Sequence, residues 1–592
     1  MKKHAYLRRF SSIALLWIPA IGAFQTHFLP SVHRRSFQPR TIPSLKETCL
    51  SNYRNGDEMG SLVTNMTEVI AIQPPGESGN TIATTENPIV NEEGAQLSIL
   101  NEGMTSADAS YGDTTSDSSS LPTSSDSTTH VLQFRAIYRD LLKASIIGLA
   151  SGVAISIFKL AVDGIRHAFY SNPVLLAQSW YRALVPVIGG LLVGCLSLPG
   201  SFPPGMMDVL TDVDRESNLP VRSIRTRVQQ QLQSLRKSAA AAVTLGTGCS
   251  LGPEGPCVEL GMSVARSCMD LQANGNRVDR LAWNRMLLSC GAASGVAAGF
   301  NAPLSGILFA MEVIRTAFRK QENDASSMLS APSAIAPVVV SSVLAALVTQ
   351  RLVGAHVVLH LSHYTLRNLL AEIPLYAVLG TLCGFVAFEF NQFSKFSKDI
   401  FQGNRGFAFV RSFMKKAPNS LKPMMGGTVC GILGLMVPGV LFVGYDSINA
   451  LLNHGAMSAP HLLMLLLTKG FATAISGGSG LVGGTFAPSL FLGAMTGASF
   501  YNVVSGIFAL FASPTVPSFP LSDLPGFTMV GAASVLAALF RAPLTATMLL
   551  FELTHDYKVL LPLMVSAGIG SVVRDILEAK ATAKYVQNKI NA

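Results

Sequence analysis

The chain has 592 residues, of which 49% are hydrophobic and 13% are charged, whereas charged residues make up about 25% of an average soluble domain. Together with a mean hydropathy of +0.39, this composition excludes a soluble enzyme and predicts a polytopic membrane protein. The net charge of +9 comes from charges scattered between apolar stretches, so nucleic acid is not an expected partner. The eight cysteines form no C-x-x-C pair, so neither a metal nor another cofactor is expected.

Residues 1–46 have the composition of a targeting leader, with eight Lys or Arg and no Asp or Glu. Residues 1–23 combine a basic start, a short apolar run and small residues before Phe24, which predicts a signal peptide. Residues 24–46 are acid-free and contain Arg and Ser, which predicts a transit peptide. The pair resembles the bipartite plastid presequence of algae with secondary plastids, such as diatoms, and implies a thylakoid or envelope membrane. A secretory signal before a polar ectodomain, or another endomembrane, is the alternative.

Residues 47–130 carry 13 acidic residues and one basic residue, Arg54. This Ser- and Thr-rich segment has almost nothing to bury and is predicted to be disordered. An apolar body follows over residues 131–592, with its main apolar runs at 146–162, 183–198, 335–353, 375–390, 462–474 and 529–551. Many runs are shorter than the roughly 20 residues of a straight span or contain Gly and Pro. Broken backbone at membrane depth is tolerated only where protein buries it or it lines a cavity, so the breaks are expected to mark a pathway.

The apolar body contains an internal repeat. With a constant offset of 240, residues 290–312 and 530–552 share 11 identities in 23 positions. With an offset of 232, the GPEGP of residues 252–256 aligns with the GTFAP of residues 484–488. We therefore expect two related halves that face opposite ways, with broken helices that meet near the membrane midplane and turn their positive N-terminal ends toward an anion.

Glu254 is the candidate gate of this pathway. Around it, glycines permit close backbone approach and prolines suit a first helical turn, so free N–H groups and the helix dipole can face an anion. A glutamate placed there can occupy the site of a permeant anion and leave when it is protonated or displaced. Phe486 takes the equivalent position in the second half, which offers a donor terminus without a gate. Gly/Pro motifs that serve only helix packing are the alternative interpretation.

Three motifs, in this order, resemble those of the CLC family of chloride channels and anion/proton exchangers. Residues 200–205 (GSFPPG) are a divergent form of its GSGIPE, residues 252–256 are a form of its GxEGP, and residues 483–488 (GGTFAP) match its GGxFxP. The resemblance covers about residues 134–577. It implies the CLC fold, an all-α membrane protein of two inverted repeats, assembled as a homodimer with one pore per subunit.

The resemblance also implies the residues of a midplane anion site. Ser201 would coordinate the central anion and Glu254 would gate it. Backbone groups would complete the site at Gly252, Gly255, Gly484, Thr485, Phe486 and Ala487. The coordinating tyrosine of the family falls on Ala583, so Tyr585, two positions later, is the candidate for that role.

Two departures from the family bear on mechanism. Pro253 stands where the family has Lys or Arg, which removes a positive charge and an amide donor near the pathway. Val313 stands where exchangers have the glutamate that passes protons inward, and valine carries no proton. The sequence therefore favours a passive channel gated by Glu254, with a coupled exchanger as the alternative. Glu312 remains beside the relay position, but its counterpart Glu552 in the repeat favours a structural role at a helix end.

Ser201 and the end of the chain bear on substrate and regulation. A hydroxyl at this position suits chloride, whereas a proline there marks nitrate-preferring plant relatives, so chloride is expected, with nitrate and bromide open. Because the sequence stops at Ala592, the paired cytosolic CBS domains that many members of the family carry are not expected.

Ser479 supports a remote alternative from another class of protein. Residues 477–480 (GGSG) fit the G-x-S-G of intramembrane serine proteases. Such an enzyme needs a histidine on a neighbouring span to activate the serine. His454, His461 and His555 do not lie within uninterrupted apolar helices, so we do not expect an enzyme.

Overall fold

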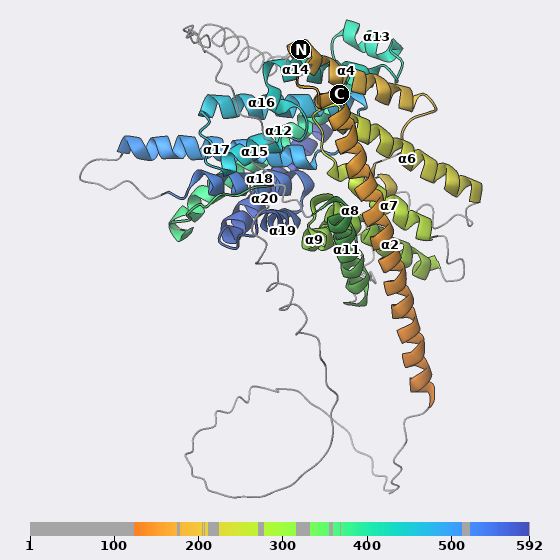
Figure 1. Cartoon of the computed structure of the whole chain (residues 1–592). Coiled ribbons are helices and arrows are strands. Elements are labelled where there is room, and N and C mark those ends of the chain that lie inside the picture. Colours follow the sequence, from red (N-terminus) through yellow and green to blue (C-terminus); the bar gives the residue numbers. More distant parts are fainter. Residues whose placement is uncertain are drawn as a thin grey trace, which may run out of the picture. The chain divides into compact units, whose positions relative to one another are not determined.

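The computed structural model describes residues 124–174, 178–203, 205–206, 208–210, 224–269, 277–314, 332–354, 359–367, 369–511 and 521–590. These residues form helices and loops (Figure 1). The strand-like pairing among them is an isolated bridge between Gly252 and Gly484. The predicted leader and most of the acidic segment lie outside the described residues. The first described helix begins at Ser124, slightly before the boundary at residue 131 that the sequence suggested.

The elements follow one another along the apolar body. In chain order they are α2 (Ser124–Tyr170), α4 (Ser179–Ser197), α6 (Ile224–Gly246), α7 (Glu254–Met269), α8 (Arg277–Phe300), α9 (Pro303–Phe309), the π-helical η1 (Ala310–Ile314), α11 (Pro332–Val353), α12 (Leu369–Phe401), α13 (Ala408–Lys416), α14 (Lys422–Met436), the 3₁₀ turn η3 (Pro438–Val440), α15 (Tyr445–Leu452), α16 (Ala459–Ser479), α17 (Phe486–Phe511), α18 (Leu524–Phe540), α19 (Pro543–Thr554) and α20 (Leu560–Ile590).

Seven of the described helices are long and apolar enough to cross a membrane. These stretches are Ile137–Tyr170, Ser179–Ser197, Ile335–Val353, Leu370–Phe401, Ala459–Ser479, Phe486–Phe511 and Leu560–Asn588. Large apolar side chains on them are exposed, for example Ile157 at 63%, as expected of residues that face lipid. The prediction of an all-α polytopic membrane protein is confirmed.

The breaks in the helices occur at equivalent places in the two halves. Helix α8 ends before Asn301 (φ 61°) and α18 ends before Arg541 (φ 58°), and both residues adopt the left-handed conformation. A proline then starts the next helix in each half, Pro303 in α9 and Pro543 in α19. The apolar run predicted at 529–551 is therefore two helices, because a left-handed residue and a proline interrupt it.

Small residues bring equivalent helix pairs close together. Helix α7 crosses α8 where Gly261 meets Gly291, and α17 crosses α18 where Gly493 meets Gly531. At each of these crossings an added Cβ would overlap the carbonyl oxygen of the facing glycine. Such close approach is typical of helices that associate within a membrane. The internal repeat of the sequence is thus a repeat of helix packing as well.

Candidate functional site

The two glycine motifs predicted from the repeat meet in the structure. The amide of Gly252 donates to the carbonyl of Gly484 over 2.8 Å, and the amide of Gly484 donates back over 2.7 Å. A Cβ on Gly484 would lie 2.7 Å from the amide nitrogen of Gly255. Only glycine allows this approach. Helices α7 and α17 begin two residues beyond the bridge, at Glu254 and Phe486, so the N-terminal ends of both halves converge here.

Glu254 is buried at this junction, with 3% of its surface exposed. Its carboxylate lies over Gly252, because a Cβ on that glycine would overlap Oε2. The backbone N–H of Ala487 faces the carboxylate from the first turn of α17. Oε2 has no hydrogen-bond partner, whereas Oε1 accepts a hydrogen bond of 3.0 Å from the hydroxyl of Tyr445. A buried carboxylate with an open oxygen therefore lies where two helix dipoles favour negative charge.

Phe486, the counterpart of Glu254, forms an aromatic wall of the site. Its ring centroid lies 5.0 Å from that of Phe300 and 4.9 Å from that of Phe540. Phe300 and Phe540 are themselves equivalent in the repeat, at the last positions of α8 and α18. Thr485 is half-buried beside Phe486, and its carbonyl accepts the amide of Ser489 over 3.0 Å. The site is thus polar on the Glu254 side and apolar on the Phe486 side.

Ser201 lies apart from these contacts. Its side chain is exposed, and its carbonyl accepts a hydrogen bond of 2.9 Å from Arg236. Arg236 also binds the carbonyl of Gly200 over 3.0 Å. The described contacts give the Ser201 hydroxyl no bond to Glu254 or to the start of α17.

Tyr585 does not reach the junction, contrary to the role expected for it. Helix α20 continues without a break to Ile590, so Tyr585 projects from its far end with 66% of its surface exposed. The tyrosine that contacts Glu254 is Tyr445, from α15. Ala583, where the gapless comparison placed the family's tyrosine, instead lines a cavity of about 690 Å³ along the last turns of α20.

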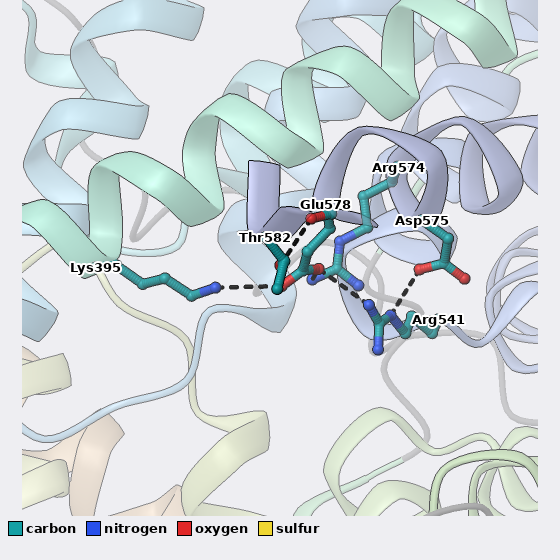
Figure 2. A network of polar contacts seen from close by, with 6 residues as sticks. All are labelled: Lys395, Arg541, Arg574, Asp575, Glu578 and Thr582. Atoms are coloured by element: carbon teal, nitrogen blue, oxygen red, sulfur yellow. Dashed lines mark hydrogen bonds and ion pairs between the residues drawn. The ribbon is translucent and has the colours of Figure 1, made fainter. Parts of the chain in front are cut away.

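A network of ion pairs fastens that end of α20 (Figure 2). Glu578 lies at its centre and binds Arg541 over 3.0 Å and Arg574 over 3.1 Å. Lys395 of α12 reaches the same carboxylate over 3.2 Å. Arg541 also pairs with Asp575 over 2.7 Å. Because Arg541 is the left-handed residue between α18 and α19, the network ties this helix break to α12 and α20.

Glu312 and Glu552 each cap the N-terminal end of a helix in the other half of the chain. Glu552 accepts the amides of Leu304 and Ser305, each over 2.8 Å, at the start of α9, and the Ser305 hydroxyl as well. Glu312 accepts the amide of Leu544 over 3.2 Å and both the amide and the hydroxyl of Thr545 over 2.8 Å, at the start of α19.

These caps relate equivalent residues of the repeat in both directions. Such reciprocity is the mark of a local two-fold relation between the halves, and α9 and α19 pack against each other (Figure 1). The carboxylate of Glu312 is therefore engaged at a helix end, as the repeat suggested. Val313, next to it, is buried in η1.

Sequence reasoning did not single out three residues near the junction: Tyr445, Lys159 and Lys469. Lys159 of α2 donates to the carbonyl of Ala298 over 2.7 Å, and its charge acts on Glu254. Lys469 is fully buried in α16. The available signal was a single lysine within each apolar run, since a charge at membrane depth indicates function by default. Tyr445 had no comparable signal.

Ser479 is placed unlike a catalytic nucleophile. Its hydroxyl is buried and donates to the carbonyl of Ser476 over 2.8 Å. A Cβ on Gly426 would overlap this hydroxyl, so α14 packs directly against it. Of the glycines at 477–480, Gly478 packs against Ser397 of α12 and Gly480 forms the left-handed end of α16. Among the described residues, no group of three His, Cys, Asp or Glu side chains is placed to hold a metal ion.

Comparison with known proteins identifies the family. A family model described as voltage gated chloride channel matches residues 200–575. The chain belongs to the CLC family. It is 36% identical over 445 residues to chloride channel protein CLC-f of Arabidopsis thaliana, across 73% of this chain and 53% of that protein. It is 34% identical over 445 residues to CLC-e of the same plant, across 72% of this chain and 58% of that protein. The chain thus spans somewhat more than half the length of these plant relatives.

Bacterial relatives and solved structures agree with this assignment. The chain is 30% identical over 385 residues to the H⁺/Cl⁻ exchange transporter ClcA of Klebsiella pneumoniae, across 62% of this chain and 74% of that protein. A slow cyanobacterial Cl⁻/H⁺ antiporter matches with a TM-score of 0.58 and 23% identity, over 74% of this chain and 95% of that one. A eukaryotic CLC transporter matches with a TM-score of 0.54 and 20% identity, over 74% and 72%. The predicted CLC fold is confirmed.

Proposed function

We propose that this CLC protein conducts anions passively across an organellar membrane, with chloride as its main anion and Glu254 as its gate. The observation that carries the proposal is the buried Glu254 carboxylate, whose Oε2 is unpartnered at the point where α7 and α17 begin. A carboxylate there takes the position that the helix ends offer to an anion. Its protonation or displacement would free that position. The hydroxyl at Ser201, in place of the proline of nitrate-preferring relatives, favours chloride.

The surroundings of the relay position support a channel over an exchanger. Val313 is buried with 8% of its surface exposed, and an apolar side chain neither accepts a proton nor attracts water. Its neighbour Glu312 already accepts three hydrogen bonds at the start of α19. A coupled anion/proton exchanger is the second candidate, since relatives such as ClcA carry that activity in their names.

Reconstitution of the full chain in liposomes, with anion flux and proton flux recorded together, tests the proposal. For a channel, the current reverses at the chloride equilibrium potential whatever the pH difference, and a chloride gradient moves no protons uphill. A reversal potential that shifts with pH at constant chloride would establish an exchanger, with Glu312 the first residue to examine as a proton carrier.

Glu254→Gln tests the gate in the same liposomes. Glutamine resembles the protonated glutamate, so we expect flux that depends less on external pH than that of the wild type. Ser479→Ala is the matched control, because the Ser479 hydroxyl donates within its own helix, to the carbonyl of Ser476, and its flux should equal that of the wild type. Unchanged pH and voltage gating in Glu254→Gln would refute the role of this residue.

Location and assembly are further parts of the proposal. The acid-free leader at residues 1–46 supports delivery to a plastid membrane, through a signal peptide at 1–23 and a transit peptide at 24–46. Residues 47–130 would then be a polar linker before the membrane body. Membership of the CLC family supports a homodimer with one anion path in each subunit.

A further inference from the structure

Tyr445, the first residue of α15, holds the carboxylate of Glu254. Its hydroxyl donates to Oε1 over 3.0 Å, while Oε2 has no partner. This contact is thus the one side-chain hydrogen bond that the described residues give to the carboxylate. We propose that Tyr445 is the latch of the gate, a positioning residue that keeps ionised Glu254 in the place of the anion and lets it go on protonation.

Residues 440–445, which end at Tyr445, form a segment that we call the latch loop. This loop is anchored firmly enough to position the Tyr445 hydroxyl. The ammonium group of Lys469 donates to the carbonyl of Val440 over 2.9 Å and to that of Phe442 over 2.6 Å. The amide of Phe442 donates to the carbonyl of Gly248 over 3.0 Å. Gly248 lies in the loop that leads into α7, so the latch loop is tied to the segment that carries the gate.

Gly444 explains how the tyrosine comes so close. Its φ of 91° lies in the left-handed region, and a Cβ there would lie 2.6 Å from the ring of Phe491. A larger residue would push the latch loop away from α17 and move Tyr445 with it. The backbone next to the latch thus has the residue type that its position requires.

The anchoring of the latch loop has a counterpart in the first half. Lys237 of α6 precedes Lys469 by the same offset of 232 that relates Glu254 to Phe486. Lys237 also donates to a loop carbonyl, that of Pro203, over 3.1 Å. Each half therefore uses an equivalent lysine to hold one loop. The loop of the first half carries Ser201, and the loop of the second half carries Tyr445.

The ionisable groups that face Glu254 come from several elements. Lys159 of α2 attracts the carboxylate through space, and Cys257 lies one turn further along α7. Lys237 of α6 pairs with Glu259 over 2.9 Å, and α17 presents the backbone of Ala487. The ammonium group of Lys159 donates its hydrogen bond to the carbonyl of Ala298 in α8. Tyr445 is thus the group whose loss removes a direct hydrogen bond from the carboxylate.

Loss of the latch should make the gate open at higher pH. A hydrogen bond to an ionised carboxylate favours the ionised form, so Tyr445→Phe should let Glu254 take up its proton more readily. From the usual strength of a hydrogen bond to a charged group, the pH of half-maximal flux should rise by about one unit. The phenylalanine keeps the packing of the ring, so the effect isolates the hydroxyl.

This inference rests on the proposed gating role of Glu254, so its test has two readouts. The first is the pH of half-maximal chloride flux in liposomes. The second is the titration midpoint of the carboxyl C=O stretching band in infrared spectra, assigned to Glu254 by its absence in Glu254→Gln. Both midpoints should rise in Tyr445→Phe. In the double variant Tyr445→Phe/Glu254→Gln, flux should equal that of Glu254→Gln alone.

Tyr376→Phe is the matched control. Tyr376 also donates to a buried glutamate over 3.0 Å, but its partner is Glu372 on the same helix, so neither midpoint of the gate should move. An unmoved infrared midpoint in Tyr445→Phe would overturn the latch whatever the flux. A raised infrared midpoint without any pH-dependent flux would uphold the hydrogen bond but overturn the gate, and with it the role of Tyr445.

Discussion

The reciprocal caps formed by Glu312 and Glu552 make a quantitative prediction about stability. Glu312→Ala removes three hydrogen bonds from the first turn of α19, two from backbone amides and one from the Thr545 hydroxyl. Hydrogen bonds to a charged group are worth about 1.5–3 kcal/mol each. Water can replace part of this hydrogen-bond energy at a half-buried site, and loss of a helix cap alone costs about 0.5–2 kcal/mol. We therefore expect Glu312→Ala to lower the free energy of unfolding by about 2–4 kcal/mol.

Glu552→Ala should cost a similar amount, because Glu552 makes the equivalent contacts with α9. Thermal unfolding of the purified protein in detergent measures both, with about 2 °C or less in Tm expected per kcal/mol for a domain of this size. Glu389→Ala is the control, since Glu389 is exposed on α12. A Tm of Glu312→Ala equal to that of the wild type, together with loss of coupled proton movement, would refute the cap and make Glu312 a proton carrier.

Two further predictions concern the junction and the leader. Gly252→Ala should displace the Glu254 carboxylate, because the added Cβ would overlap Oε2 and lie 3.2 Å from the Cβ of Ala487. Chloride flux should then lose its pH dependence, as in Glu254→Gln. Gly506→Ala is the control, since its added Cβ has no atom within 4 Å, and it should leave flux unchanged. Residues 1–46 fused to a fluorescent reporter should carry it into the plastid of an alga with a secondary plastid and should fail to do so with Phe24→Ala; a secreted reporter would contradict the plastid location.

The sequence predicted the parts of the fold that follow from local pattern. The offset of 232 located both glycine motifs and the offset of 240 paired Pro303 with Pro543, because a close backbone contact and a first helical turn need particular residue types. The break at Arg541 was not predicted, since it falls inside the apolar run expected at 529–551. The bridge between Gly252 and Gly484 joins the two glycine motifs. The equivalence of Glu312 and Glu552 likewise indicated a role at helix ends before their partners were known.

The sequence did not predict contacts between distant residues of ordinary type. Tyr445 lies 191 positions from Glu254, and a tyrosine at the start of a short helix carries no mark of its partner. Tyr585 was chosen from its nearness to a family position, but the unbroken α20 carries it away from the junction. Such contacts depend on tertiary packing, which local pattern does not record.

The two halves differ where their symmetry would otherwise be unfavourable. The two-fold relation pairs Glu254 with Phe486, and the bridge of Gly252 with Gly484 brings these positions close together. Two glutamates there would place two buried carboxylates side by side, and like charges at such a distance cannot both ionise. Phe486 avoids that conflict and packs between the equivalent rings of Phe300 and Phe540. The broken symmetry leaves one carboxylate and two converging helix ends, so a single protonation is enough to change the charge of the whole site.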